Sequence, residues 1–154
     1  MNRRELAAVG ALLLTSGARA DHPWRPYQGV PPLYIEGDVK TLLWNDPHPH
    51  LRLVHEPAQR LPTDLRERKL LPHRGAESTA QLLSHVVVPV FERAWRVELP
   101  TLAKLLEWGV ERPEIGEPVG VVGLPGPDVE GTATMQAVVL FIDSQGYPLG
   151  SARP

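Results

Sequence analysis

The 154-residue chain contains no cysteine, which excludes disulfides, thiolate metal sites and lipids attached through cysteine. Aromatic residues make up 6% of the sequence, and beyond the first twenty residues no apolar run is long enough to span a bilayer. Basic residues number 16 against 18 acidic ones, whereas binding of a phosphate backbone depends mainly on basic residues. We therefore expect a soluble protein with no membrane anchor and no affinity for nucleic acid.

The first twenty residues have the three parts of an export signal. Arg3 and Arg4 give a positive start, residues 6–14 form an apolar stretch, and Ala18-Arg19-Ala20 is a small-x-small cleavage site. Cleavage there would leave 134 residues, enough for one domain, with a net charge of −4 instead of −2 because three arginines and one glutamate are removed. We expect a periplasmic protein. Asn2–Leu6 also partly matches a twin-arginine signal, so both export routes stay open.

The rest of the chain shows a regular succession of strand patterns. Residues 21–32 contain four prolines and no periodicity, which predicts an extended amino-terminal arm. Residues 33–44 alternate as a long, half-buried strand, and Gly37 interrupts it where a bulge or sharp coil would let it bend. Four more strands are expected at about residues 48–55, 91–99, 118–124 and 133–142.

One helix is expected between the third and fourth strands, opened by Pro100-Thr101 and stopped by Gly109. A helix in this place, together with a bent first strand, is the chain order of the OB-fold barrel. The sequence therefore predicts a mainly β protein, with an OB-like five-stranded barrel over residues 33–150. An insertion at 56–90 follows the second strand.

Local patterns give finer expectations for packing. In the first strand one face is expected to carry Leu33, Ile35, Val39, Thr41 and Leu43. In the helix the shared face is expected to carry Leu102, Leu105 and Leu106. Within the insertion, residues 61–71 predict a short helix and residues 79–90 are ambiguous, with a strand favoured in their second half by Val86–Val88. Residues 125–132 predict a Gly/Pro loop, and 144–146 a final turn.

The histidines are the main candidates for chemistry. His48 and His50 are two residues apart on the expected second strand, so both would project from one face, about 6.5 to 7 Å apart at the backbone. With His22 and the amine of Asp21 they form a nitrogen-rich set suited to Cu(II), with zinc or nickel as alternatives, and Asp46 could supply an oxygen.

A simpler interpretation of the same histidines stays open. His48 and His50 would then lie in a solvated turn, and His22 in the arm. A brace made by an amino-terminal histidine needs histidine in first place, whereas cleavage after Ala20 puts Asp21 there. His55 would face away from His48 and His50.

Other groups give weaker signals. An aromatic platform for bases or sugars is conceivable from Trp24, Tyr27, Tyr34 and Trp44, but core packing explains these residues more simply. The acidic side chains of Glu36 and Asp38 share the outward face of the first strand and are expected to be solvated. Because neither a catalytic triad nor a phosphate-binding loop has the required spacing, the protein is not expected to be an enzyme.

Several motifs resemble those of a family of small uncharacterised periplasmic proteins of Gram-negative bacteria, whose mature chains usually open with His-His-Ser. The matching residues are His22, Ile35–Val39, Trp44–His48, Trp95–Pro100 and Leu102–Gly109. The resemblance implies an OB-like domain with no established activity. In the family, a short hairpin takes the place of residues 56–90. This chain has one histidine where the family has two, and Asp46 is an extra residue in the family's Asn-Pro-His turn.

Together these features predict an exported periplasmic binding or accessory protein with copper, or another divalent metal, as its first candidate ligand. The alternative is an interaction module of the cell envelope that recognises a protein or glycan without metal. Copper is the one cofactor that the sequence suggests.

Overall fold

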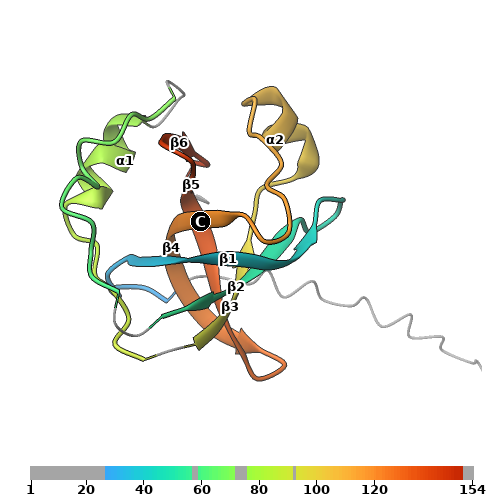
Figure 1. Cartoon of the computed structure of the whole chain (residues 1–154), viewed down its shortest axis with the longest axis horizontal. Helices are drawn as coiled ribbons and strands as arrows, with labels where there is room; N and C mark the ends of the chain where they lie inside the picture. The colour runs from blue at the N-terminus through green and yellow to red at the C-terminus, as the bar shows by residue number, and fades with distance from the viewer. Residues whose placement is uncertain (1–26, 57–58, 72–75, 92, 151–154) are drawn as a thin grey trace, which may run out of the picture.

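The computed structural model describes residues 27–56, 59–71, 76–91 and 93–150 (Figure 1). Its strands are β1 (Leu33–Leu43), β2 (His50–His55), β3 (Arg93–Glu98), β4 (Pro118–Val129), β5 (Thr132–Ile142) and β6 (Gln145–Pro148). Its helices are α1 (Ala76–Leu83) and α2 (Leu102–Glu107). The expected export signal, Asp21, His22 and most of the arm lie outside the described residues.

The strands close into a barrel. Their order is β3-β2-β1-β4-β5-β6, and a parallel pairing of β3 with β5 joins the two sides of the sheet. Helix α2 stands between β3 and β4, near one end of the strands, whereas the β4–β5 turn lies at the opposite end (Figure 1). This is the OB-type arrangement, and the predicted five-stranded barrel with one helix between strands 3 and 4 is confirmed.

Strand β1 serves both sides of the barrel. Its residues 33–38 pair with β4, and residues 39–43 pair with β2. Gly37 lies just before this change of partner, where a Cβ atom would collide with the carbonyl oxygen of Val54. The bulge itself is not at Gly37, because the register shifts between Val39 and Thr41. Past the shift, Leu42 packs against the core, whereas Thr41 and Leu43 are exposed. The prediction that Thr41 and Leu43 share a face with Ile35 and Val39 is therefore wrong.

The barrel interior is filled from every strand, as the alternation of apolar residues predicts. Its fully buried members include Ile35, Leu51, Leu53, Val97, Val121, Met135 and Leu140. Leu105 of α2 is also fully buried, whereas Leu106 is 67% exposed, so the shared leucine face expected for this helix is wrong. A six-residue helix presents only one narrow face, and the partly buried Trp108 just after it packs against the barrel core instead. Gly109, at φ +65, follows the helix as predicted.

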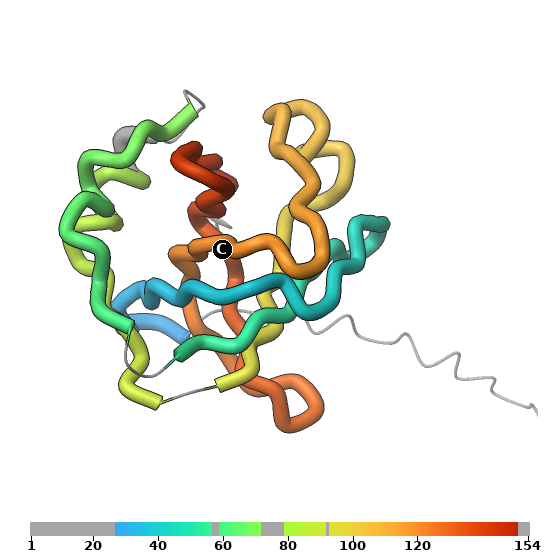
Figure 2. The backbone as a smooth tube through the Cα atoms, in the orientation of Figure 1, coloured from blue at the N-terminus to red at the C-terminus, as the bar shows by residue number. Residues whose placement is uncertain are grey.

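The insertion forms a second hydrophobic core on the outside of the barrel. Tyr34, Val122, Val138, Val139 and Phe141 of β1, β4 and β5 pack there with Leu65, Leu83 and Val86 of the insertion. Figure 2 shows this segment, in green, along one side of the barrel. Two backbone contacts tie it to the strands, since Val87 near its end pairs with Leu33 and Leu70 near its middle pairs with Gly146. The insertion is therefore part of the folded domain.

Two local expectations for the insertion need correction. Residues 61–71 form turns around Asp64 and no helix, whereas a helix forms at Ala76–Leu83. In the ambiguous stretch 79–90 the helix takes the first half, and only Val87 of the second half makes a strand-like bridge. Leu65 is anchored in the second core, and that tertiary contact shapes the turn more strongly than local helix propensity does.

The Gly/Pro stretch at 125–132 is mostly strand rather than the expected loop. Strand β4 continues to Val129, and the turn shrinks to Glu130 and Gly131, both at positive φ. The pairing of β4 with β1 ends at Gly123, which lies opposite Leu33. Beyond this pair β4 is at an edge of the sheet, where proline is tolerated. After the next turn, residues 145–148 form β6 instead of ending in a simple turn.

Replacing Gly37 by alanine is expected to lower the free energy of unfolding by about 3 kcal/mol, because the new methyl group meets the Val54 carbonyl and the backbone must move. Urea denaturation of the two proteins measures the difference. Lys40→Ala, an exposed change on the same strand, is the control and should stay within about 0.5 kcal/mol of wild type. Equal stability of Gly37→Ala and wild type would contradict the close approach.

Candidate functional site

The turn between β1 and β2 is tied to helix α2. Asp46 Oδ1 accepts a hydrogen bond of 3.0 Å from the backbone N–H of Leu102, the first residue of α2. Thr101, in the N-cap position, makes no side-chain cap of its own, so Asp46 supplies the acceptor from a distant part of the chain. The carboxylate expected as a possible metal ligand therefore has a structural partner.

The two histidines of this turn do not share a strand. His48 is exposed and precedes β2, which begins at His50, and the buried Pro49 between them accepts a hydrogen bond from the Leu99 N–H. The expected second strand therefore begins two residues later than His48, and His48 lies outside it. Because proline has no N–H to donate, Pro49 can take part in the sheet only through its carbonyl oxygen.

His50 is nevertheless held in a defined orientation. Its Nδ1–H donates to the carbonyl oxygen of His48, with 3.0 Å between the two atoms. A carbonyl can only accept, so in the neutral ring the lone pair is on Nε2. Metal-bound histidines typically donate their second ring nitrogen to a carbonyl or carboxylate in this way. His50 could thus contribute Nε2 to a ligand.

The outer face of β2 and β3 around His50 is polar, whereas the β1 residue opposite His50 is the exposed Leu43. His50 stands opposite Glu98 of β3, and Arg52 stands opposite Arg96 two pairs further along. Arg96 Nε donates to Glu98 Oε1 at 2.6 Å, and both side chains are about one-fifth to one-quarter exposed. Arg52 is exposed. This surface carries charges of both signs and offers donors, acceptors and one imidazole to a ligand.

The described residues alone do not complete a metal site. They contain no group of three or more histidine, cysteine, aspartate or glutamate side chains that could hold a metal ion. Asp21 and His22, the other proposed ligands, lie outside the described part of the chain. His55 is fully buried and donates Nε2–H to the Pro89 carbonyl at 3.0 Å, so it faces away from His50 as predicted.

The aromatic residues do not form a platform within the described structure. Tyr34 is 1% exposed and belongs to the second core, whereas Trp44 packs, partly buried, against the barrel core. Tyr27 is 53% exposed, and Trp24 lies outside the described residues. Core packing, the simpler of the two interpretations, accounts for Tyr34 and Trp44.

A polar cluster that the sequence did not reveal lies where the insertion meets the barrel. Tyr34 Oη donates to Glu36 Oε2 at 2.7 Å, and Arg68 of the insertion is paired with Asp64 at 3.2 Å. Burial, reinforced by the Glu36 carboxylate, raises the pKa of Tyr34, so its hydroxyl stays protonated. Asp38 is exposed as expected, but Glu36 is half-buried. Only tertiary structure brings Arg68 to strand β1, so no spacing in the sequence could indicate this cluster.

The scan against family models, the search of curated proteins and the search of solved structures each found no match. The resemblance to small periplasmic proteins therefore stays a prediction from the sequence motifs. No helix within the described ranges is long and apolar enough to cross a membrane.

Replacing Asp46 by alanine is expected to cost about 1 kcal/mol of stability, because the Leu102 N–H at the start of α2 loses its acceptor. Asp46→Asn keeps a side-chain oxygen and should recover most of the loss. Thermal unfolding of both variants against wild type measures the effect. If alanine and asparagine were equally stable, the hydrogen bond would contribute nothing.

Proposed function

We propose that the protein is an exported, periplasmic binding or accessory domain that acts by binding rather than by catalysis. Its ligand surface is the outer face of β1, β2 and β3 around His50. The observation that carries this proposal is the unequal covering of the barrel. The insertion packs over the outer face of β1, β4 and β5, whereas the face around His50 presents half-buried and exposed polar groups.

Cu(II) or another divalent metal is the ligand we propose first. Support comes from His50, whose hydrogen bond to the His48 carbonyl leaves Nε2 to bind a metal. His48 lies two residues away and is exposed. An imidazole-rich, cysteine-free set of this kind suits Cu(II), and His22 with the amine of Asp21 would supply further nitrogens.

Isothermal titration with CuCl₂ at neutral pH tests this site in purified protein whose first residue has been shown by mass spectrometry to be Asp21. We expect saturable heat, and a loss of affinity of about 10-fold or more in the double variant His48→Ala, His50→Ala. His85→Ala, an exposed histidine of the insertion, is the matched control and should bind like wild type. Absence of heat above buffer, or unchanged binding by the double variant, would overturn the proposal.

Recognition of a protein or glycan of the cell envelope is the second candidate function. One observation favours it, namely that Val90 at the end of the insertion and the adjacent Phe91 are each 74% exposed. Large apolar side chains exposed next to each other are typical of interaction surfaces.

Changing Val90 and Phe91 to serine should abolish crosslinking to an envelope partner in whole cells while leaving copper titration and unfolding free energy unchanged, because both side chains are exposed. Leu106→Ser, an exposed apolar residue on α2, serves as the control. Crosslinks that persist in the serine variant would show that this end of the insertion is not the contact surface.

A further inference from the structure

Two arginines stand directly opposite each other on the outer face of β2 and β3. Arg52 and Arg96 are register partners in this antiparallel pair, where the Cβ atoms of opposite residues lie about 4.5–5.5 Å apart. The adjacent Leu53 and Val97 are buried in the barrel core, so both arginine side chains project from the outer surface. Like charges placed directly opposite each other destabilise a sheet. An anion between the two side chains would remove this repulsion.

The positive charge of Arg52 is not balanced within the described part of the chain. Arg52 is exposed, and its guanidinium takes part in none of the ion pairs there. Arg96 differs, because its Nε donates to Glu98 Oε1 at 2.6 Å. That bond uses one of the three guanidinium nitrogens, so both Nη atoms of Arg96 remain as donors. The two arginines together offer more hydrogen-bond donors than Glu98 can accept.

The bulge in β1 adds a third basic residue. The register of β1 and β2 shifts between Val39 and Thr41, so Lys40 is the extra residue and Thr41 stands opposite Arg52. Lys40 and Thr41 are both exposed. Although the whole chain has a net charge of −2, basic side chains outnumber acidic ones at this place. They are Lys40, Arg52 and Arg96, against Glu98 and, two residues before Lys40, Asp38.

The surface next to the arginine pair, on the side away from His50, is made of small side chains. Val54 and Ala94 are the next register partners on the same face, and Ala94 is exposed. Neither side chain carries a charge or extends as far as a guanidinium. An anion can therefore approach Arg52 and Arg96 from this side without meeting a bulky or acidic neighbour.

We infer that Arg52 and Arg96 bind a phosphate group, with Lys40 and the hydroxyl of Thr41 beside them as further donors. The inference rests on the proposed use of this face as a ligand surface but requires no metal. A carboxylate matches the fork of a single guanidinium, whereas the tetrahedral oxygens of phosphate can accept hydrogen bonds from two arginines on different strands. Such a group belongs either to a small soluble phosphate monoester or to the headgroup of a membrane lipid.

Nuclear magnetic resonance titration of the ¹⁵N-labelled protein with phenyl phosphate, in metal-free buffer at constant ionic strength and neutral pH, tests the inference. We expect saturable shifts of the backbone amides of Thr41, Arg52 and Arg96. Benzoate, which carries a carboxylate on the same ring, should bind about 10-fold more weakly or less.

Vesicles distinguish the two sources of phosphate. Co-sedimentation with vesicles of phosphatidylcholine and phosphatidic acid, but not with vesicles of phosphatidylcholine alone, identifies a lipid headgroup. Binding of phenyl phosphate without co-sedimentation identifies a soluble monoester.

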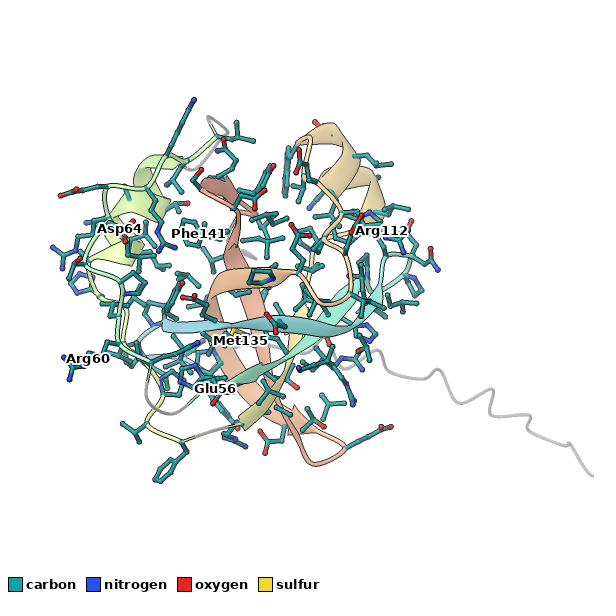
Figure 3. The ribbon with its side chains drawn as sticks, viewed as in Figure 1. Glu56, Arg60, Asp64, Arg112, Met135 and Phe141 are labelled. Atoms are coloured by element: carbon teal, nitrogen blue, oxygen red, sulfur yellow. The ribbon has the colours of Figure 1, made fainter. Side chains whose placement is uncertain are left out.

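Arg52→Gln should weaken the binding of phenyl phosphate by about 10-fold or more, because a charged hydrogen-bond donor is lost. Arg52 is exposed, so this variant is expected to fold. Arg60→Gln is the matched control and should bind like wild type, since Arg60 is exposed on the insertion and points away from the barrel (Figure 3). Glu98→Gln should strengthen binding by about 3-fold, because a negative charge next to Arg96 is removed.

Three outcomes would overturn the inference. They are the lack of saturable shifts with phenyl phosphate, equal binding of benzoate, and wild-type affinity in Arg52→Gln. Because the titration contains no metal, these outcomes leave the copper proposal intact, and failure of the CuCl₂ titration would in turn leave the phosphate site intact.

Discussion

The structure depends on one strand pairing with two different neighbours. Strand β1 pairs with β4 through residue 38 and with β2 from residue 39 onward. This division lets a single sheet curve until β3 meets β5. It requires close approach to the Val54 carbonyl at Gly37 and an extra residue next to Val39, and these two features lie within four residues of each other. The position of the β1–β2 turn, and with it Asp46 and His50, follows from that bend.

The insertion converts part of the barrel's outer surface into an interior. Tyr34, Val122 and Phe141 point away from the barrel core and would be exposed without it. The same packing places Arg68 over Phe141 and thereby creates the polar cluster at the boundary between the two cores. The burial of this face and the polar cluster thus have one origin, whereas the surface around His50 is left uncovered.

The sequence predicts the barrel well because alternation along strands directly reflects which side faces a core. The order of strands and the helix between β3 and β4 are confirmed for that reason. Errors occur where a tertiary contact decides. Thr41 and Leu43 change faces because of a bulge, Leu106 is exposed because α2 is short, and the Gly/Pro stretch remains a strand because it lies at an edge.

The candidate sites were less predictable than the fold. His50 could be selected from the spacing of histidines, but its bond to the His48 carbonyl depends on where β2 begins. The Glu36–Arg68 region could not be found, because 32 positions separate these residues and no repeating pattern connects them. Only the packing of the insertion brings the two side chains into one polar cluster.

The parallel contact between β3 and β5, together with the bridge from Leu70 to Gly146, has a consequence for how the chain acquires its structure. The β3–β5 pairing cannot form before residues 133–136 have left the ribosome, and the Leu70–Gly146 bridge cannot form before residue 146 has done so. Such sequence-distant pairings slow folding, because a long loop must close before the contact repays its entropy. If the proposed export signal is used, a barrel that completes only after residue 146 has been made is compatible with transport in the unfolded state.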